Sequence, residues 1–421
     1  MPVYLWQLGL SLAGLCLLLG ISGLAFSAAL VTWQRLARTR ALTRLVGLTF
    51  VLELVLITCV ALAGPLLGAD TPTPQGQGIR SGEPSRALGS ASTIQAATLV
   101  ALLVGAANGA YNAFYWTTQR ALFAGLGTER DSGRRYGNLQ IIVAGFLKVG
   151  ILLGGFLLDT GGLHWILLLS AAVGLLGARA LAADAGCLPL QDEPHLSVRR
   201  ALAYRDAHGS ARVFTIDGLF LYLESHFWTL SLFLLVREDH SRLGVVVVVL
   251  GIVFALLFLL IKNRIDRPGA ADAVYRASVA LYALSWLLRL AVDEAAAASV
   301  TLALLVGVTF CSSLFRLAFN KRFFDIARHG ASGTGADVPL GPVAYLIAKS
   351  HVSQLCMAAL FLPLGVLVHA SGTADDILLG TLYLLAVPLS FAYLGYRRPL
   401  ASPDVRTLPV LPADPRARER G

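Results

Sequence analysis

The strongest constraint on this chain is a series of apolar runs, each long enough to cross a lipid bilayer. The hydrocarbon core is about 30 Å thick, and about 20 helical residues span it. In these 421 residues, 56% are hydrophobic and 14% are charged. We expect eleven spans, at 6–32, 45–67, 94–118, 138–158, 163–183, 213–236, 244–262, 274–292, 298–319, 342–368 and 376–396. A membrane β-barrel would need alternating segments of about ten residues, and these runs do not alternate. The sequence predicts an all-α integral membrane protein.

Basic residues predict the orientation of the spans. The net charge is +9, and Lys and Arg gather in every second connection, beginning with the connection at 34–44 and ending with Arg397 and Arg398. Cytoplasmic connections carry such an excess, so we expect the C-terminus inside and, with eleven spans, Met1 outside. The chain is expected in a bacterial-type inner membrane. Because topology explains the basic connections, we expect no nucleic-acid partner.

Sequence motifs favour neither catalysis nor a bound cofactor. The five cysteines are scattered and include no CxxC pair, unlike a disulfide framework or a metal site. No GxxxxGK[ST] loop, HExxH pair or nucleophile elbow occurs. We expect a protein that is not an enzyme and holds no metal or cofactor.

The two halves of the chain show a weak internal repeat. A shift of 201 residues places Lys148 on Lys349, and it also aligns the polar segments 106–120 and 307–321. A shift of 229 aligns the basic connection at 34–44 with 263–273. By the same shift, the first-half equivalent of span 213–236 would lie mostly before Met1. We therefore expect two six-span bundles from which most of the first helix is missing. The alternative is that the protein has always had eleven spans.

These features resemble the major facilitator superfamily of secondary transporters. The likeness is carried by the basic connections QRLARTRALTR (34–44) and KNRIDRPG (262–269), by the segment FAGLGTERDSGRRYGNLQ, and by the glycine-rich run GFLKVGILLGGFLLD. The first connection lacks the usual Asp, and the second has Pro-Gly in place of Gly-Arg-Arg. The resemblance implies gating connections that contain Arg35, Arg38, Asp266 and Arg267.

The same resemblance implies a two-bundle fold with a pseudo-two-fold repeat. We expect an N-terminal bundle of about five spans at 1–183, a cytoplasmic linker at 184–212, a C-terminal bundle of six spans at 213–398, and a disordered tail at 399–421. The expected partners of this monomer are the lipid bilayer, a small-molecule solute and a coupling proton.

A polar stripe interrupts the apolar span at 94–118. Its members recur at helical spacing and therefore share one face: Asn108, Tyr111, Asn112, Tyr115, Trp116 and Gln119. In the second half, a matching stripe consists of Thr309, Ser312, Ser313, Arg316 and Asn320. We interpret the two stripes as opposite walls of a solute pocket. The alternative is that the polar groups join neighbouring helices.

Charged residues inside the spans are the other candidates for function. A Lys at the centre of a span costs about 2.5–3.5 kcal/mol on insertion, so Lys148 and Lys349 need compensation. With Arg316, they are candidates to hold an anionic group, or each pairs with a nearby carboxylate. Glu224 is the leading site for proton coupling, with Asp217 second because it lies near a span end and is expected to be solvated. The side chains of His351 and Gln354 could join the network of Lys349, whereas Glu53 and Arg289 are expected to be interface or snorkelling groups.

The sequence predicts a secondary active transporter that moves a small anionic or zwitterionic solute by alternating access. Two alternatives stay open. An exporter of amphipathic compounds would depend more on the aromatic stripe than on the lysines. A degenerate, non-transporting membrane factor would explain the weakened basic motif.

Overall fold

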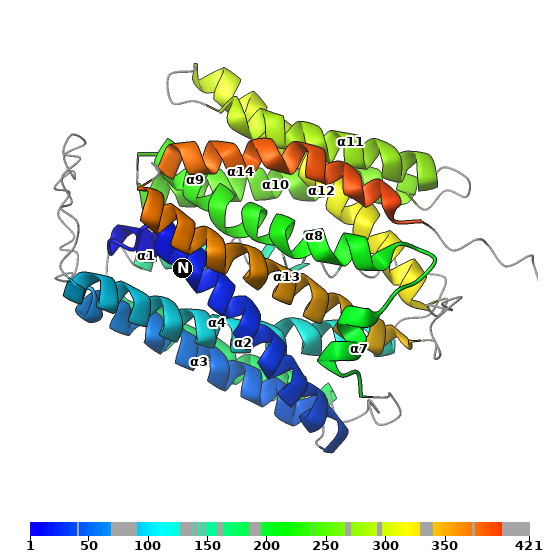
Figure 1. Cartoon of the computed structure of the whole chain (residues 1–421), viewed down its shortest axis with the longest axis horizontal. Coiled ribbons are helices and arrows are strands. Elements are labelled where there is room, and N and C mark those ends of the chain that lie inside the picture. Colours follow the sequence, from blue (N-terminus) through cyan, green and yellow to red (C-terminus); the bar gives the residue numbers. More distant parts are fainter. Residues whose placement is uncertain are drawn as a thin grey trace, which may run out of the picture.

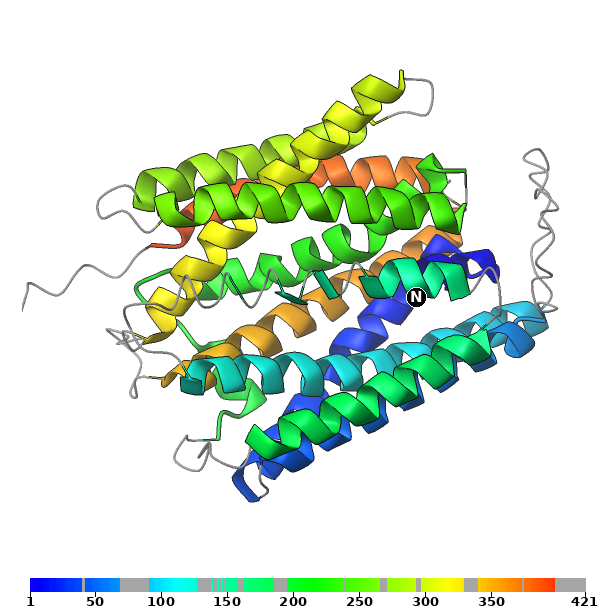
Figure 2. The same ribbon diagram turned by 180° about the vertical axis from the view of Figure 1, so that it is seen from behind.

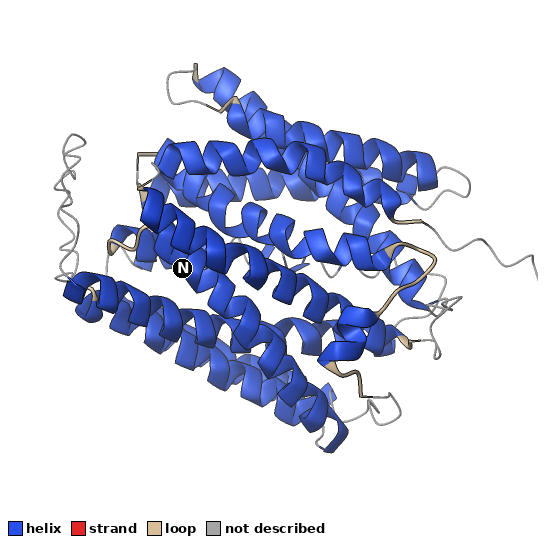
Figure 3. Ribbon diagram, in the orientation of Figure 1, coloured by secondary structure: helices blue, strands red, loops and turns tan. Residues whose placement is uncertain are grey.

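The fold is known from a computed structural model of the chain. The structure describes residues 1–39, 42–68, 91–126, 149–157, 163–184, 195–237, 239–265, 271–292, 297–328, 340–372 and 375–397, with isolated positions between 138 and 146. Every secondary-structure element in these ranges is a helix (Figure 3). The prediction of an all-α fold is confirmed.

Seven of the described helical segments are long and apolar enough to cross a membrane. They are α2 (Leu12–Thr39), α3 (Leu42–Leu66), α4 (Ala91–Leu126), the continuous segment α8 (Ser210–Tyr222), η2 (Leu223–Phe227) and α9 (Trp228–Leu235), α12 (Ala298–Arg328), α13 (Pro342–Ser371), and α14 (Asp375–Ser390) with η3 (Phe391–Gly395). Large apolar side chains such as Leu175 and Leu367 are exposed on the outer faces, as contact with lipid requires. The chain is a multi-pass membrane protein.

Three more helices lie where spans were expected. They are α6 (Leu163–Asp184), α10 (His240–Ile265) and α11 (Ala271–Leu290). The longest apolar stretches of α6 and α10 among the described residues are short, at His164–Gly177 and Arg242–Val253. The expected span at 138–158 is described only in part, and the tail at 399–421 lies outside the described residues. The count of eleven spans stays a prediction.

The first span differs from the prediction. Instead of running from 6 to 32, the N-terminal segment divides into a short helix, α1 (Pro2–Gln7), and the long helix α2. Gly9 separates them with a φ of 94°, a conformation that glycine adopts without strain and that ends an α-helix. As a result α2 begins at Leu12. Its other end, Thr39, lies about two turns beyond the predicted end.

The helices form two groups, and α13 lies between them. Helices α2, α3, α4 and α6 pack together, and α11 packs against α12 and α14 while α10 packs against α12. Between these groups, α13 contacts both α2 and α8 (Figure 1). In Figure 1, α14 lies in front of α10 and α12, and in the reverse view α10 lies in front of α14 (Figure 2). The short helix α7 (Val198–Ala203) packs against α13.

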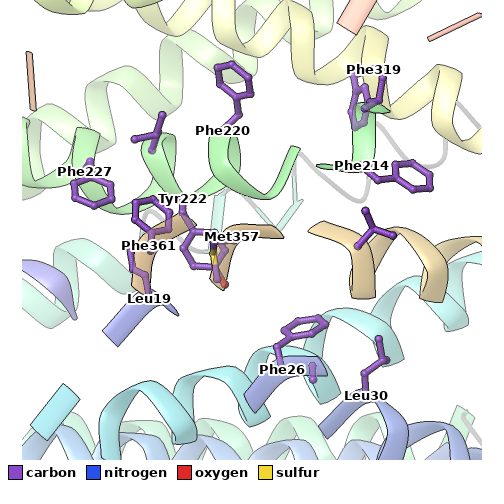
Figure 4. Packing of buried hydrophobic residues seen from close by; sticks show 14 of the residues in the cluster. Leu19, Phe26, Leu30, Phe214, Phe220, Tyr222, Phe227, Phe319, Met357 and Phe361 are labelled. Carbon is purple, nitrogen blue, oxygen red and sulfur yellow. The ribbon is translucent and has the colours of Figure 1, made fainter. Parts of the chain in front are cut away.

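Buried aromatic and aliphatic side chains fill the junction of α2, α13 and the α8–η2–α9 segment. Phe227 stacks on Phe361 with ring centroids 5.5 Å apart, and Leu19 of α2 lies beside them (Figure 4). Tyr222 and Met357 meet one turn away in the same view. This apolar contact holds α2, of the first group, against α13.

Glycines permit unusually close approach between these helices. Gly105 and Gly109 of α4 face α2, and a methyl group added at Gly109 would meet the carbonyl oxygen of Ser22 and lie 2.8 Å from the backbone nitrogen of Phe26. Small residues spaced four apart allow such contact in membrane proteins. The α2–α4 interface therefore depends on the absence of a side chain at these positions.

We predict that Gly109→Ala lowers the free energy of unfolding of the detergent-solubilised protein by about 1–3 kcal/mol and with it the melting temperature, because the added methyl would overpack the interface. Gly380→Ala is the matched control, since α14 leaves open space around Gly380 and alanine favours a helix. Differential scanning fluorimetry compares the two variants. Equal melting temperatures would contradict the proposed close packing.

Candidate functional site

The candidate site is built around two carboxylates on one spanning segment. Asp217 lies in α8, and Glu224 lies in η2, a single π-helical turn between α8 and α9. Wide turns of this kind occur inside α-helices, frequently at functional sites. The sequence places the two residues seven apart, and the structure keeps both on the side that faces α12.

Arg316 of α12 joins the two carboxylates. Its Nε donates to Glu224 Oε2 at 2.8 Å, and its Nη1 donates to Asp217 Oδ1 at 2.8 Å. The remaining Nη2 reaches the hydroxyl of Tyr282 in α11 at 3.4 Å. One guanidinium thus connects three helical segments, which its planar set of five N–H donors makes possible.

Asp217 is also bonded to side chains of α13 and η3. Lys349 Nζ of α13 donates to Asp217 Oδ2 at 2.5 Å, and the Tyr393 hydroxyl of η3 donates to Oδ1 at 2.9 Å. The Asp217 residue is only 2% exposed. The expectation that Asp217 is solvated at a span end is therefore wrong, because α12, α13 and η3 close around it.

Two positive and two negative side chains make the cluster formally neutral: Arg316, Lys349, Asp217 and Glu224. Burying charges in a low-dielectric region is tolerable when they are paired and hydrogen-bonded. The interpretation that Lys349 pairs with a carboxylate is thus met, and so is the alternative that Asp217 and Glu224 are partners of the cations. We call these four residues the ionic cluster.

The ionic cluster is more open on its Glu224 edge. The side chains of Arg316 and Glu224 are 20% and 16% exposed, against 9% and 3% for Lys349 and Asp217. Glu224 Oε1 is buried and has no hydrogen-bond partner among the described residues. Glu224 is therefore held by fewer contacts than Asp217.

The polar stripe of α4 is partly used for helix packing. Asn108 Nδ2 donates to Ser22 Oγ of α2 at 2.8 Å, so this residue joins two helices. Below it, Asn112 Nδ2 donates to Asn108 Oδ1, and Trp116 Nε1 donates to Asn112 Oδ1 at 3.0 Å. Tyr111 stacks on Tyr115, which lies edge-on to Trp116. The stripe is a hydrogen-bonded, stacked ladder, and its members below Asn108 remain partly exposed.

The two predicted stripes make contacts with different partners. The α4 stripe is bonded to α2, whereas the second stripe is bonded to α8 and α11 through Arg316 and Ser312. Gln119 and Asn320 are half-buried and make no side-chain hydrogen bond within the described ranges. A pocket shared by the two stripes stays a prediction.

The other predicted residues that the structure describes lie outside the ionic cluster. Arg35 and Arg38 are exposed in the last turns of α2. Lys148, Asp266 and Arg267 lie outside the described residues. His351 and Gln354 do not join Lys349. His351 Nδ1 lies 2.7 Å from Ser27 Oγ, and Gln354 accepts from the Tyr222 hydroxyl at 3.3 Å.

Glu53 and Arg289 lie at helix interfaces, as expected. Glu53 accepts from Ser170 of α6 at 3.1 Å. Arg289 donates to Ser285 and Ser312, and its guanidinium lies 4.0 Å from the ring of Trp286. Such cation–π contact compensates in part for the loss of water.

Two members of the site escaped the sequence interpretation. Tyr282 and Tyr393 place their hydroxyls on Arg316 and Asp217, but each occurs in an apolar run that the sequence interpretation did not single out. Ser22 was missed for the same reason. A signal was present for the α4 packing face, because Gly105 and Gly109 form a GxxxG motif that overlaps the start of the stripe.

Comparisons with known proteins leave the function open. No protein-family model and no curated protein matches this sequence. Among solved structures, the human organic anion transporter MFSD10 (TETRAN) is similar over 92% of this chain and 87% of its own, at 16% identity and a TM-score of 0.49. A likeness of this strength carries no argument about activity.

We predict that Asp217→Asn lowers the free energy of unfolding by about 3–5 kcal/mol, because it leaves Lys349 without its carboxylate in a buried site. The double variant Asp217→Asn/Lys349→Met should recover part of this loss, since it removes the unpaired charge. Thermal unfolding in detergent measures both.

The control is Arg242→Gln, which breaks the exposed pair with Asp239 and should change stability by less than about 1 kcal/mol. A loss in the double variant as large as the sum of the two single losses would show that Asp217 and Lys349 are not coupled.

Proposed function

We propose that this protein is a secondary active transporter of the major facilitator type, which moves a small anionic or zwitterionic solute and uses protonation of Glu224 to control its binding site. The observation that supports the proposal is the neutral ionic cluster. Charged side chains inside a membrane usually mark substrate or proton pathways. Here they join three spanning segments of the proposed C-terminal bundle.

Charge balance explains how a proton and an anion could be coupled. With both carboxylates ionised, the cluster has no net charge and offers no attraction to an anion. Protonation of one carboxylate leaves a net charge of +1 and releases an N–H donor. A bound anionic solute then restores neutrality, so the loaded state needs both ligands.

Glu224 is the better candidate for this proton than Asp217. Asp217 accepts from Arg316, Lys349 and Tyr393, and losing its charge would disrupt all three contacts. Glu224 Oε2 accepts from Arg316, and its second oxygen has no hydrogen-bond partner among the described residues. Once Glu224 is neutral, the Nε edge of Arg316 could bind a carboxylate of the solute.

The proposed moving parts are an N-terminal bundle at 1–183 and a C-terminal bundle at 213–398, joined by the linker 184–212. Most contacts between them run through α2 and α13. The linker takes part, because the Gln34 side chain of α2 donates to the Leu196 carbonyl and accepts from the Leu196 N–H. These hydrogen bonds would have to open when the site is exposed to the side of the membrane on which the linker lies, which is expected to be the cytoplasm.

A transport assay with proteoliposomes tests the role of Glu224. We expect Glu224→Gln to keep solute exchange across the membrane at equal pH but to lose accumulation driven by a pH gradient, because glutamine mimics the protonated acid at all pH values. A panel of radiolabelled organic anions supplies the substrates.

Glu53→Gln is the matched control, since Glu53 is also a carboxylate in a span but bonds Ser170 rather than the ionic cluster. It should retain gradient-driven uptake. Full gradient-driven uptake by Glu224→Gln would rule out the assigned proton site.

A second measurement separates anion transport from export of amphipathic compounds. If the cations hold the solute, Arg316→Ala and Lys349→Ala should each reduce anion uptake at least about 100-fold while the protein still inserts, since a lost charge-assisted hydrogen bond in a buried site costs several kcal/mol. Trp116→Ala should have a smaller effect. A larger effect of Trp116→Ala, measured with amphipathic amines, would favour the exporter.

A further inference from the structure

A separate cavity opens at the end of the second helix group, away from the ionic cluster. Its volume is about 560 Å³. It lies between the start of α11, the end of α14 with η3, and the turn before α8, at the right-hand end of Figure 1. The residues that argue for a ligand are Asp272, Arg276, Arg322, Arg397 and His208.

The positive charge in this cavity exceeds the negative charge. Three arginines line it with one carboxylate, and that carboxylate, Asp272, is already paired with Arg322. Arg276 and Arg397 are exposed and form no ion pair within the described residues. The cavity therefore presents two guanidinium groups that have no carboxylate partner there.

The wall of the cavity is held in place by buried contacts. Arg322 is 8% exposed, stacks on the ring of Tyr275 at 3.7 Å and donates to the Tyr396 carbonyl at 2.6 Å. The Tyr396 hydroxyl is bonded to Tyr345 of α13 at 2.7 Å, and the backbone N–H of Arg397 donates to the His208 carbonyl. A positive site built on fixed backbone and buried rings needs little reordering to bind a ligand.

The location of the cavity narrows the class of anion. The linker helix α7 lies at the same end of the molecule (Figure 1), and the basic connections predict that this end faces the cytoplasm. Basic pockets among spanning helices at that level bind phosphorylated lipid headgroups. A phosphate offers three acceptor oxygens, and arginine forks match them better than lysine does.

We propose that this cavity is a phosphate-binding site that takes either the headgroup of an anionic phospholipid or a soluble phosphate monoester, with Arg276 and Arg397 as its ligands. The site does not depend on the proposed transport function. Arg322 orients the wall, and its pair with Asp272 keeps that carboxylate away from the incoming phosphate.

Binding to the full-length protein in nanodiscs tests this inference. Phosphatidylcholine nanodiscs with and without phosphatidic acid are compared by thermal unfolding, and glycerol 3-phosphate is added to the phosphatidylcholine sample. We expect stabilisation by at least one of the two phosphates. Stabilisation by phosphatidic acid alone identifies a lipid site, and stabilisation by glycerol 3-phosphate as well identifies a site open to soluble phosphates.

The variant Arg276→Gln/Arg397→Gln should weaken binding about 10- to 30-fold, because each basic side chain near a membrane surface strengthens the binding of an anion about five-fold. The control Arg199→Gln/Arg200→Gln removes the same charge from exposed positions of α7 that do not line the cavity. Binding should be unchanged in this control.

Two results would overturn the inference. One is a melting temperature that neither phosphate raises in the unsubstituted protein. The other is equal weakening in both double variants, which would mean that phosphate responds to the general basic charge of this surface rather than to the cavity.

Discussion

The paired carboxylates and cations between α8, α12 and α13 are the interaction on which the rest of the structure depends. Asp217 accepts from three side chains that belong to three different helical segments. Each of those side chains would be costly in a membrane without its partner, and together they fix how the segments lie relative to one another. The same contacts make the region responsive, because adding one proton or one anion changes a neutral cluster into a charged one.

Close helix packing provides the frame that keeps this cluster buried. Gly218 of α8 faces the backbone of Ser353 in α13, and the Ser353 hydroxyl donates to the Phe214 carbonyl. One turn before Ser353 in the same helix lies Lys349. The approach of the two backbones therefore brings the lysine within reach of Asp217. Gly218 thus sets the distance between α8 and α13, and this distance allows the ion pair between Lys349 and Asp217.

The two halves of the internal repeat differ in what their corresponding polar faces contact. The shift of 201 residues aligns Tyr115 with Arg316, yet the α4 stripe forms a ladder of its own and bonds to α2, while Arg316 reaches two carboxylates. Sequence similarity between the halves predicts the same helix face in both, but the partners of that face depend on the helices that pack against it.

The sequence by itself determined the all-helical membrane class, since long apolar runs leave no other structure in lipid, and it located most helices and singled out Arg316, Lys349, Asp217 and Glu224. Helix ends were less predictable, because Gly9 interrupts an apolar run without changing its hydropathy. Only the tertiary structure decided which charges pair, that Asp217 is buried, and that Tyr282 and Tyr393 complete the cluster. The physical reason is that periodicity reports the face on which a residue lies, whereas its partner depends on packing between helices that are distant in sequence.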